Sequence, residues 1–154
     1  MKDTTLCYLE NKGRYLMLLR NKKKNDPNKN KWIGVGGKLE AGESPHECAR
    51  REIFEETGIK ADNLLYRGRV HFNSDIYEDE IMHLFTAFCD TEDFISCNEG
   101  ELRWIKKEDV MGLNLWEGDK VFLEYLLNDS DEFFEMTVSY EGDILKSVQK
   151  GIKL

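Results

Sequence analysis

Long apolar runs, prolines and closely paired cysteines are all scarce in this 154-residue sequence. No apolar run approaches the roughly 20 residues of a membrane-spanning helix, and the N-terminal stretch MKDTTLCYLENKG lacks the apolar core of a signal peptide. The cysteines, Cys7, Cys48, Cys89 and Cys97, form no C-x-x-C pair, which argues against a zinc knuckle or a redox motif. A cytoplasmic protein that stays out of the membrane is expected.

Positive charge is also in deficit, because 22 lysines and arginines stand against 30 acidic residues, giving a net charge of −8. This balance disfavours a nucleic-acid duplex or an anionic membrane as a partner. A phosphorylated small molecule remains possible, since a bound metal can reverse the local field. The hydrophobic content of 40% is typical of a globular chain, and the length predicts one domain over residues 1–154, as a monomer or a homodimer.

Apolar periodicity and turn residues predict an α+β fold with two main helices. Residues 21–31, NKKKNDPNKNK, are expected to form a mobile surface loop whose charge serves either solvation or the steering of phosphates. Expected strands cover 4–10, 14–20, 32–37 (running into a turn), 64–72, 81–88, 101–107 and a hairpin over 133–149, and the expected helices cover 45–57 and 116–129.

The helix over 45–57 has unusually clear boundary signals. Ser44 and Glu47 have the spacing of a capping box, and Pro45 occupies the first helical position. Gly58 can adopt the left-handed conformation that ends a helix. These signals fix the orientation of the side chains in between.

Three glutamates of that helix, Glu52, Glu55 and Glu56, are spaced to share one face. Arg51 lies four residues from both Glu47 and Glu55 and can pair with and orient either carboxylate. At a solvated face the repulsion between the glutamates costs a few tenths of a kcal/mol, about 0.2–0.5 per pair. Carboxylate oxygens are also the ligands that Mg²⁺ and Mn²⁺ prefer. The cluster is therefore either a solvated acidic face or a metal site.

The arrangement of these residues resembles the Nudix box, G-x5-E-x7-R-E-U-x-E-E-x-G-U, where U is aliphatic. Gly37, Glu43 and the run REIFEETGI over 51–59 match all nine constrained positions. The resemblance implies the Nudix fold, an α/β/α sandwich around a mixed β-sheet. It also implies Mg²⁺-dependent hydrolysis of a nucleoside diphosphate linked to another group, and it argues strongly against a merely solvated helix.

The same resemblance implies a role for each box residue. Arg51 is expected to orient a glutamate, and Glu43 to support the loop before the helix rather than take part in chemistry. The metal ligands implied are Glu52, Glu55, Glu56 and the Gly37 carbonyl.

The segments around the box are similar to those of MutT/MutX-like 8-oxo-dGTP diphosphatases of bacteria and animals. The similar segments are WIGVGGKLEAGES (32–44), NEGELRW (98–104), LWEGDKVFLEYLL (115–127) and FFEMTVSYEGDIL (133–145). The similarity thus extends over nearly the whole chain, although it is loose between these segments.

Substrate contacts are expected at five positions. Trp116 can stack on a purine or pack as a core aromatic at a helix start, and Asp119 can read the base edge or respond to the helix dipole. Ile33 stands where the animal enzymes have an asparagine that reads the base, so base selectivity is open. Lys38 follows the glycine turn and can contact a phosphate or remain solvated, and Arg20 is a weaker phosphate candidate.

A glutamate outside the box is implied as the general base. Glu99, five residues before Trp104, matches the position at which the similar enzymes bring a glutamate to the metal cluster. Glu101 is the alternative in this segment, and Glu55 or Glu56 could serve instead.

The function expected is conversion of a purine nucleoside triphosphate, with 8-oxo-dGTP leading, to the monophosphate and pyrophosphate. A dinucleoside polyphosphate or ADP-ribose is the alternative substrate. Tyr77, 18 residues past the box, keeps the former open, and Ser74 replaces the proline typical of ADP-ribose enzymes. A non-catalytic nucleotide sensor is the third hypothesis, which the intact box disfavours.

Overall fold

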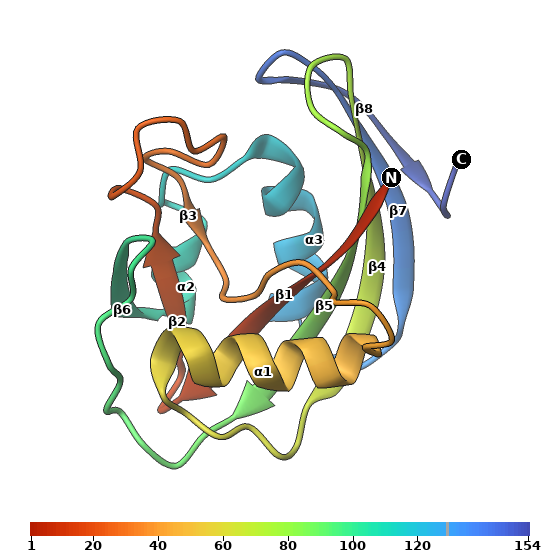
Figure 1. Ribbon diagram of the computed structural model, residues 1–154. Helices are drawn as coiled ribbons and strands as arrows, with labels where there is room; N and C mark the ends of the chain where they lie inside the picture. The colour runs from red at the N-terminus through yellow and green to blue at the C-terminus, as the bar shows by residue number, and fades with distance from the viewer. Residues whose placement is uncertain (129) are drawn as a thin grey trace.

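The computed structural model describes residues 1–128 and 130–154 (Figure 1). The described strands are β1 Lys2–Asn11, β2 Arg14–Leu19, β3 Trp32–Ile33, β4 Leu65–Ser74, β5 Glu80–Phe88, β6 Glu101–Lys106, β7 Phe134–Glu141 and β8 Ile144–Lys150. The described helices are α1 Pro45–Thr57, α2 Lys107–Val110 and α3 Glu117–Leu127. Both main helices lie where the sequence predicts them, and residue 129, at the end of the second predicted helix, lies outside the described residues.

The strands form one mixed sheet of eight strands in the order β3-β2-β1-β5-β4-β7-β8, with β6 paired to β2. β1 pairs with β5 in parallel, and so does β4 with β7, whereas the other pairs are antiparallel. The parallel pair β1–β5 joins segments that are about 78 residues apart, since Lys2 lies opposite Glu80.

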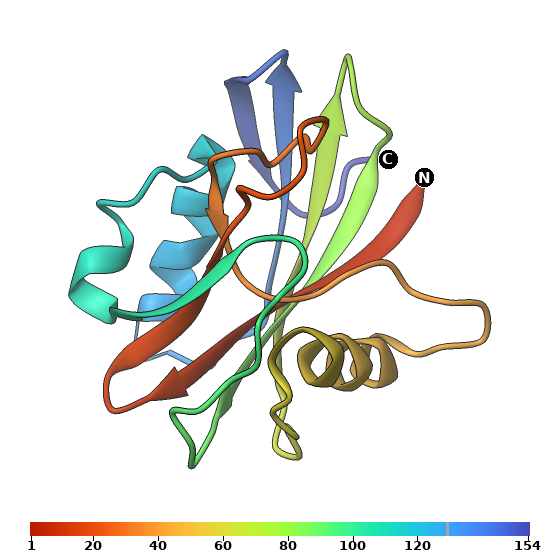
Figure 2. The ribbon, with the colours of Figure 1, turned by 60° about the vertical axis from the view of Figure 1, so that its left-hand side comes forward.

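Helices cover both faces of the sheet (Figures 1 and 2). The buried residues Ala49 and Ile53 of α1 pack into one hydrophobic cluster, and Phe122 and Leu123 of α3 pack into the other. The predicted α/β/α sandwich around a mixed sheet is therefore confirmed. No helix among the described residues has the length and apolar character needed to cross a membrane.

The basic segment 21–31 is exposed over most of its length, but both of its ends are tied to the fold. The backbone N–H groups of Arg20 and Asn30 donate to the carbonyls of Lys31 and Arg20. Within the segment Asp26 accepts a hydrogen bond from Arg20 at 2.6 Å. These bonds hold the segment over one end of the sheet, next to the site described below.

Candidate active site

Helix α1 begins and ends as its sequence predicts. The Ser44 hydroxyl accepts a hydrogen bond from the Glu47 N–H at 3.1 Å, and the Glu47 carboxylate accepts one from the Ser44 N–H at 3.0 Å. Gly58 has the left-handed φ of 76° that permits the C-cap. Because Ala49 and Ile53 are buried against the sheet, most of the helix's charged side chains are left along its other faces.

Arg51 is the centre of the acidic cluster on α1. Its guanidinium donates to Glu43 at 2.7 and 2.9 Å, to Glu52 at 2.8 Å and to Glu55 at 3.2 Å. The bidentate contact lowers the pKa of Glu43 to about 2. Arg51 thus fixes the loop before the helix through Glu43 and orients two box glutamates at once, the geometry that the sequence resemblance implies for it.

Gly36 and Gly37 pass between β1 and the acidic face of α1, where a side chain would not fit. A Cβ at Gly36 would lie 1.9 Å from the Thr5 carbonyl oxygen, and one at Gly37 would lie 2.5 Å from the Glu52 carboxyl carbon. The Gly36 N–H donates to Glu56 at 3.2 Å, and the Gly37 carbonyl accepts the Thr5 N–H at 2.8 Å. The predicted turn is absent here: strand β3 ends at Ile33, and the glycine segment 34–37 runs on beside β1, bridged to it at Val35 and Lys38, in direct contact with the box carboxylates.

Glu56 is the buried member of the acidic cluster, with 9% of its surface exposed. Burial raises the pKa of its carboxyl, and the negative charges of Glu99 and Glu52 raise it further. Glu99 thus faces the box, held by Arg20 at 3.3 Å. Glu101 instead pairs with Arg103 on the exposed side of β6. Of the two candidates from this segment, Glu99 is the one whose charge raises the pKa of box glutamates.

The acidic cluster offers a divalent cation hard oxygen donors in a partly buried place where the carboxylates repel one another. A cation would relieve the repulsion that raises the pKa of Glu56. Across residues 1–128 and 130–154, no three acidic, histidine or cysteine side chains already converge at the spacing of a metal site. Glu52 and Glu55 are turned toward Arg51 instead. Arg51 engages only one oxygen of each of these carboxylates, Oε1 of Glu52 and Oε2 of Glu55, and the donor types fit a hard ion.

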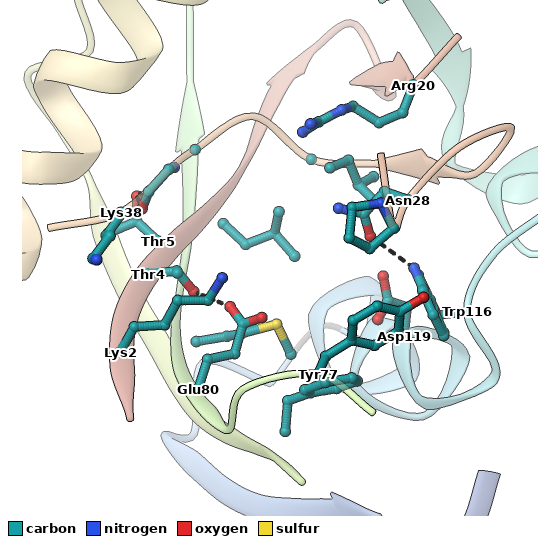
Figure 3. Close-up of a pocket in the computed structure, with 18 of the residues that line it drawn as sticks. Lys2, Thr4, Thr5, Arg20, Asn28, Lys38, Tyr77, Glu80, Trp116 and Asp119 are labelled. Atoms are coloured by element: carbon teal, nitrogen blue, oxygen red, sulfur yellow. Dashed lines mark hydrogen bonds between the residues drawn. The ribbon is translucent and has the colours of Figure 1, made fainter. Parts of the chain in front are cut away.

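A cavity of about 400 Å³ opens beside the glycine segment 34–37 (Figure 3). Gly37 and Lys38 line one end, and Trp116 and Asp119 line the other, with Ile33 in the wall. The volume lies in the range of small-molecule sites. All the residues that the sequence predicts for phosphate and base contacts therefore line one cavity, and the box glutamates lie behind its glycine wall.

Trp116 both packs in the core and reaches the cavity. Its ring meets Phe72 and Tyr140 edge to face, with centroids 6.2 and 5.3 Å apart, and Lys31 Nζ lies 5.5 Å from its centroid. Its indole N–H donates to the Asn28 side chain at 2.8 Å, which ties the segment 21–31 to the N-cap residue of α3. Trp116 is therefore a packed core aromatic that also lines the cavity, and stacking on a purine stays a prediction.

Asp119 is 7% exposed in the first turn of α3 and lines the cavity. Burial raises the pKa of its carboxyl to about 8, the nearby charge of Glu80 acts in the same direction, and Lys31 opposes them. Within the described part of the chain its carboxyl has no hydrogen-bond partner. At neutral pH Asp119 is therefore mostly protonated and can donate a hydrogen bond to a ligand as well as accept one.

Several cavity residues escape reasoning from sequence. Asp26, Pro27 and Asn28 line it from the basic segment, and Thr4 and Glu80 line it from β1 and β5. The first group had a usable signal, because Asp-Pro-Asn is a turn sequence and contains one of only two prolines. Thr4 and Glu80 had none, since only the parallel pairing of β1 with β5 brings them together.

Comparisons with known proteins agree with this geometry. The family model of the NUDIX domain matches residues 2–126. The chain is 30% identical over 132 residues to the Nudix hydrolase YvcI of Bacillus subtilis, covering 82% of this chain and 80% of that protein. It is also 30% identical over 128 residues to the oxidized purine nucleoside triphosphate hydrolase of Danio rerio, with the same shares covered.

Solved structures give the same result. The fold matches a MutT protein from Bacillus halodurans with a TM-score of 0.84 and 30% identity over 97% of both chains. A MutT protein from Methanosarcina mazei Go1 matches with a TM-score of 0.69 and 27% identity over 80% of this chain and 91% of that one. Nudix hydrolases cleave pyrophosphate bonds in small nucleotide substrates and generally use divalent metal ions. The extent of these matches and the intact box place this chain in the Nudix hydrolase family.

Proposed function

We propose that this enzyme hydrolyses oxidised purine nucleoside triphosphates, with 8-oxo-dGTP as the leading substrate, to a nucleoside monophosphate and pyrophosphate, with Mg²⁺ or in its place Mn²⁺. The observation that carries the proposal is the cavity that runs from the glycine segment 34–37 to the buried pair Trp116 and Asp119. A triphosphate fits the end with Lys38, and a purine fits the aromatic end.

The chain's own residues divide the chemistry between binding and proton transfer. Glu99 removes a proton from the water that attacks the β-phosphorus, and the bond from that phosphorus to the oxygen bridging to the α-phosphate breaks. Lys38 and Arg20, which line the cavity, bind the phosphates, and Arg51 sets the orientation of the box carboxylates. Positioning and charge stabilisation supply most of the rate enhancement in such a reaction.

The metal would be held by Glu52, Glu55, Glu56 and Glu99, with the Gly37 carbonyl as a further donor. When bound, it supplies positive charge that offsets the charge of the triphosphate and the charge that builds up on the phosphate under attack. This accounts for binding of a polyanion by a chain whose net charge is −8.

Two features support an oxidised purine as the base. The protonated Asp119 can donate to a base carbonyl, and Trp116 lines the end of the cavity that would take the purine. Ile33 leaves the facing wall apolar, so Asp119 carries more of the recognition than it would beside an asparagine. The name of the Danio rerio relative is consistent with this substrate class.

A dinucleoside polyphosphate is the second candidate substrate, and one observation favours it. Tyr77, at the spacing typical of such enzymes, lines the cavity and could stack on a second base. A panel that contains Ap4A separates the two substrates directly.

The catalytic part of the proposal is tested by steady-state turnover with Mg²⁺ for the wild type and for Glu56→Gln, Glu99→Gln and Glu101→Gln. The first two substitutions are expected to lower kcat by at least about 100-fold, the lower range for losing a positioned acid or base. Glu101→Gln is the matched control and should stay within about 3-fold. A wild type that binds nucleotide but never turns it over would instead indicate a sensor, and equal losses in Glu99→Gln and Glu101→Gln would overturn the assignment of the base.

A further inference from the structure

The cavity contains a second carboxylate, Glu80, that lies between its two ends. Thr4 and Lys38 form an antiparallel bridge, which places Thr4 next to the phosphate end. The Thr4 hydroxyl donates to Glu80 Oε2 at 2.7 Å. At the other end Asp119 lies close enough to Glu80 to sense its charge. Figure 3 shows this order, with Lys38 on one side, Thr4 and Glu80 in the middle and Asp119 on the far side.

Glu80 has an oxygen to spare for a ligand. Its Oε2 is bound by Thr4, whereas Oε1 has no partner among the hydrogen bonds and ion pairs of the described residues. The other charged groups that line this part of the cavity are Lys2 from β1 and Glu78 from the β4–β5 loop. Glu78 is half exposed and pairs with the N-terminal amine at 3.2 Å. Glu80 is therefore the carboxylate that the fold fixes toward the middle of the cavity.

The part of a nucleotide that joins its base to its phosphates is the sugar, whose hydroxyls are hydrogen-bond donors. An acidic side chain that accepts a hydrogen bond from a ribose hydroxyl is a known solution in dinucleotide-binding folds. A carboxylate cannot serve as a phosphate contact, because the two repel. The base edge is already met by Asp119 at the buried end.

We propose that Glu80, held in place by Thr4, is a specificity-determining residue that accepts a hydrogen bond from a hydroxyl of the substrate's sugar. The proposal rests on the proposed function, in that a nucleotide must occupy the cavity with its phosphates toward Lys38. It goes further by assigning sugar selectivity to a residue outside both the Nudix box and the base site. Thr4 is a positioning residue that acts through Glu80.

The test compares the ribo, deoxy and 2′,3′-dideoxy forms of one nucleoside triphosphate that the wild type hydrolyses. For the wild type, removal of the recognised hydroxyl is expected to lower kcat/KM by about 10-fold to 100-fold, the range for a hydrogen bond to a charged group. Glu80→Ala should reduce this discrimination to below about 3-fold, and Glu80→Gln should keep part of it, because a neutral acceptor forms a weaker hydrogen bond. The sugar discrimination of Thr4→Val should lie between that of Glu80→Ala and that of the wild type. Glu78→Ala, which removes a different carboxylate of the same cavity, is the matched control and should keep the full discrimination.

The comparison in which kcat/KM falls identifies the recognised hydroxyl. A fall from the ribo to the deoxy form points to the 2′ hydroxyl, and a fall from the deoxy to the dideoxy form points to the 3′ hydroxyl. The proposal is overturned if the wild type does not discriminate, or if Glu80→Ala discriminates as the wild type does. A second comparison uses guanine and inosine nucleotides with the same sugar, because inosine lacks the 2-amino group of guanine. The proposal is also overturned if Glu80→Ala keeps its preference among the sugars and loses only a preference for guanine over inosine, because Glu80 would then read the base.

The proposed preference for an oxidised base can fail while the sugar proposal holds. Equal kcat/KM values for 8-oxo-dGTP and dGTP would overturn the former and leave the sugar comparison unaffected. If no triphosphate turns over, calorimetric dissociation constants for the same three sugars replace kcat/KM. If none binds, both proposals are overturned.

Discussion

Replacing Asp119 by asparagine should change how the stability of this protein depends on pH. Burial raises the pKa of the Asp119 carboxyl from 3.8 to about 8 in the folded state. Between these values the folded protein keeps a proton that the unfolded chain has lost. Stability contributed by this site therefore falls as pH rises, with a limiting slope of about 1.4 kcal/mol per pH unit. Asparagine has nearly the same shape and cannot ionise, so it removes the slope.

The size of the effect follows from the pH window. From pH 5 to pH 7, two units inside the window, the wild type should lose up to about 2.7 kcal/mol relative to Asp119→Asn. Local relaxation around the ionised carboxyl would reduce this to about 1–2 kcal/mol. Burial is the main cause of the shift, and of the neighbouring charges Glu80 raises the pKa while Lys31 lowers it.

The assay is urea denaturation of both proteins at pH 5, 6 and 7, with the difference in unfolding free energy taken at each pH. Titrating groups far from residue 119 contribute equally to both proteins and cancel in this difference. Glu117→Gln, an exposed substitution in the same helical turn, is the matched control and should give a difference that is flat with pH. A flat difference for Asp119→Asn would refute the reasoning, because Asp119 would then be ionised in the folded protein throughout.

Two further substitutions test the geometry around the box. Gly36→Ala should lower stability by about 1–3 kcal/mol in thermal denaturation, since its Cβ would lie 1.9 Å from the Thr5 carbonyl oxygen. Gly112→Ala, whose Cβ would meet only ordinary contacts, should be nearly neutral, and equal losses in both would contradict the close approach. Arg51→Lys should lower kcat at least about 10-fold while folding is retained, because lysine cannot contact several carboxylates in a fixed fork. Arg50→Lys is its control, and unchanged kcat in Arg51→Lys would rule out the orienting role.

Local signals explain why some of this structure could be predicted. The capping box of Ser44 and Glu47 and the left-handed Gly58 act over a few residues, so the boundaries of α1 follow from the sequence. The box glutamates then fall on one helix at a fixed spacing. Their partner Glu99 could be named only from resemblance, because its approach depends on the path of the chain before β6.

Long-range pairing explains what could not be predicted. The bond between Thr4 and Glu80 joins residues 76 positions apart and exists because β1 and β5 pair in parallel. The bond between Asn28 and Trp116 joins residues 88 positions apart and makes a surface loop part of the cavity wall. No periodicity or turn signal reports such contacts, and the raised pKa of Asp119 follows from burial that only the folded chain creates.

The central claim is tested most directly by kcat/KM for 8-oxo-dGTP and dGTP with purified protein and Mg²⁺, alongside the other dNTPs, ADP-ribose and Ap4A, with identification of the products. The account predicts a preference for 8-oxo-dGTP over dGTP of more than about 10-fold, equivalent to about 1.4 kcal/mol of transition-state binding, with release of pyrophosphate. A flat profile across the dNTPs, or a preference for Ap4A or ADP-ribose, would contradict it.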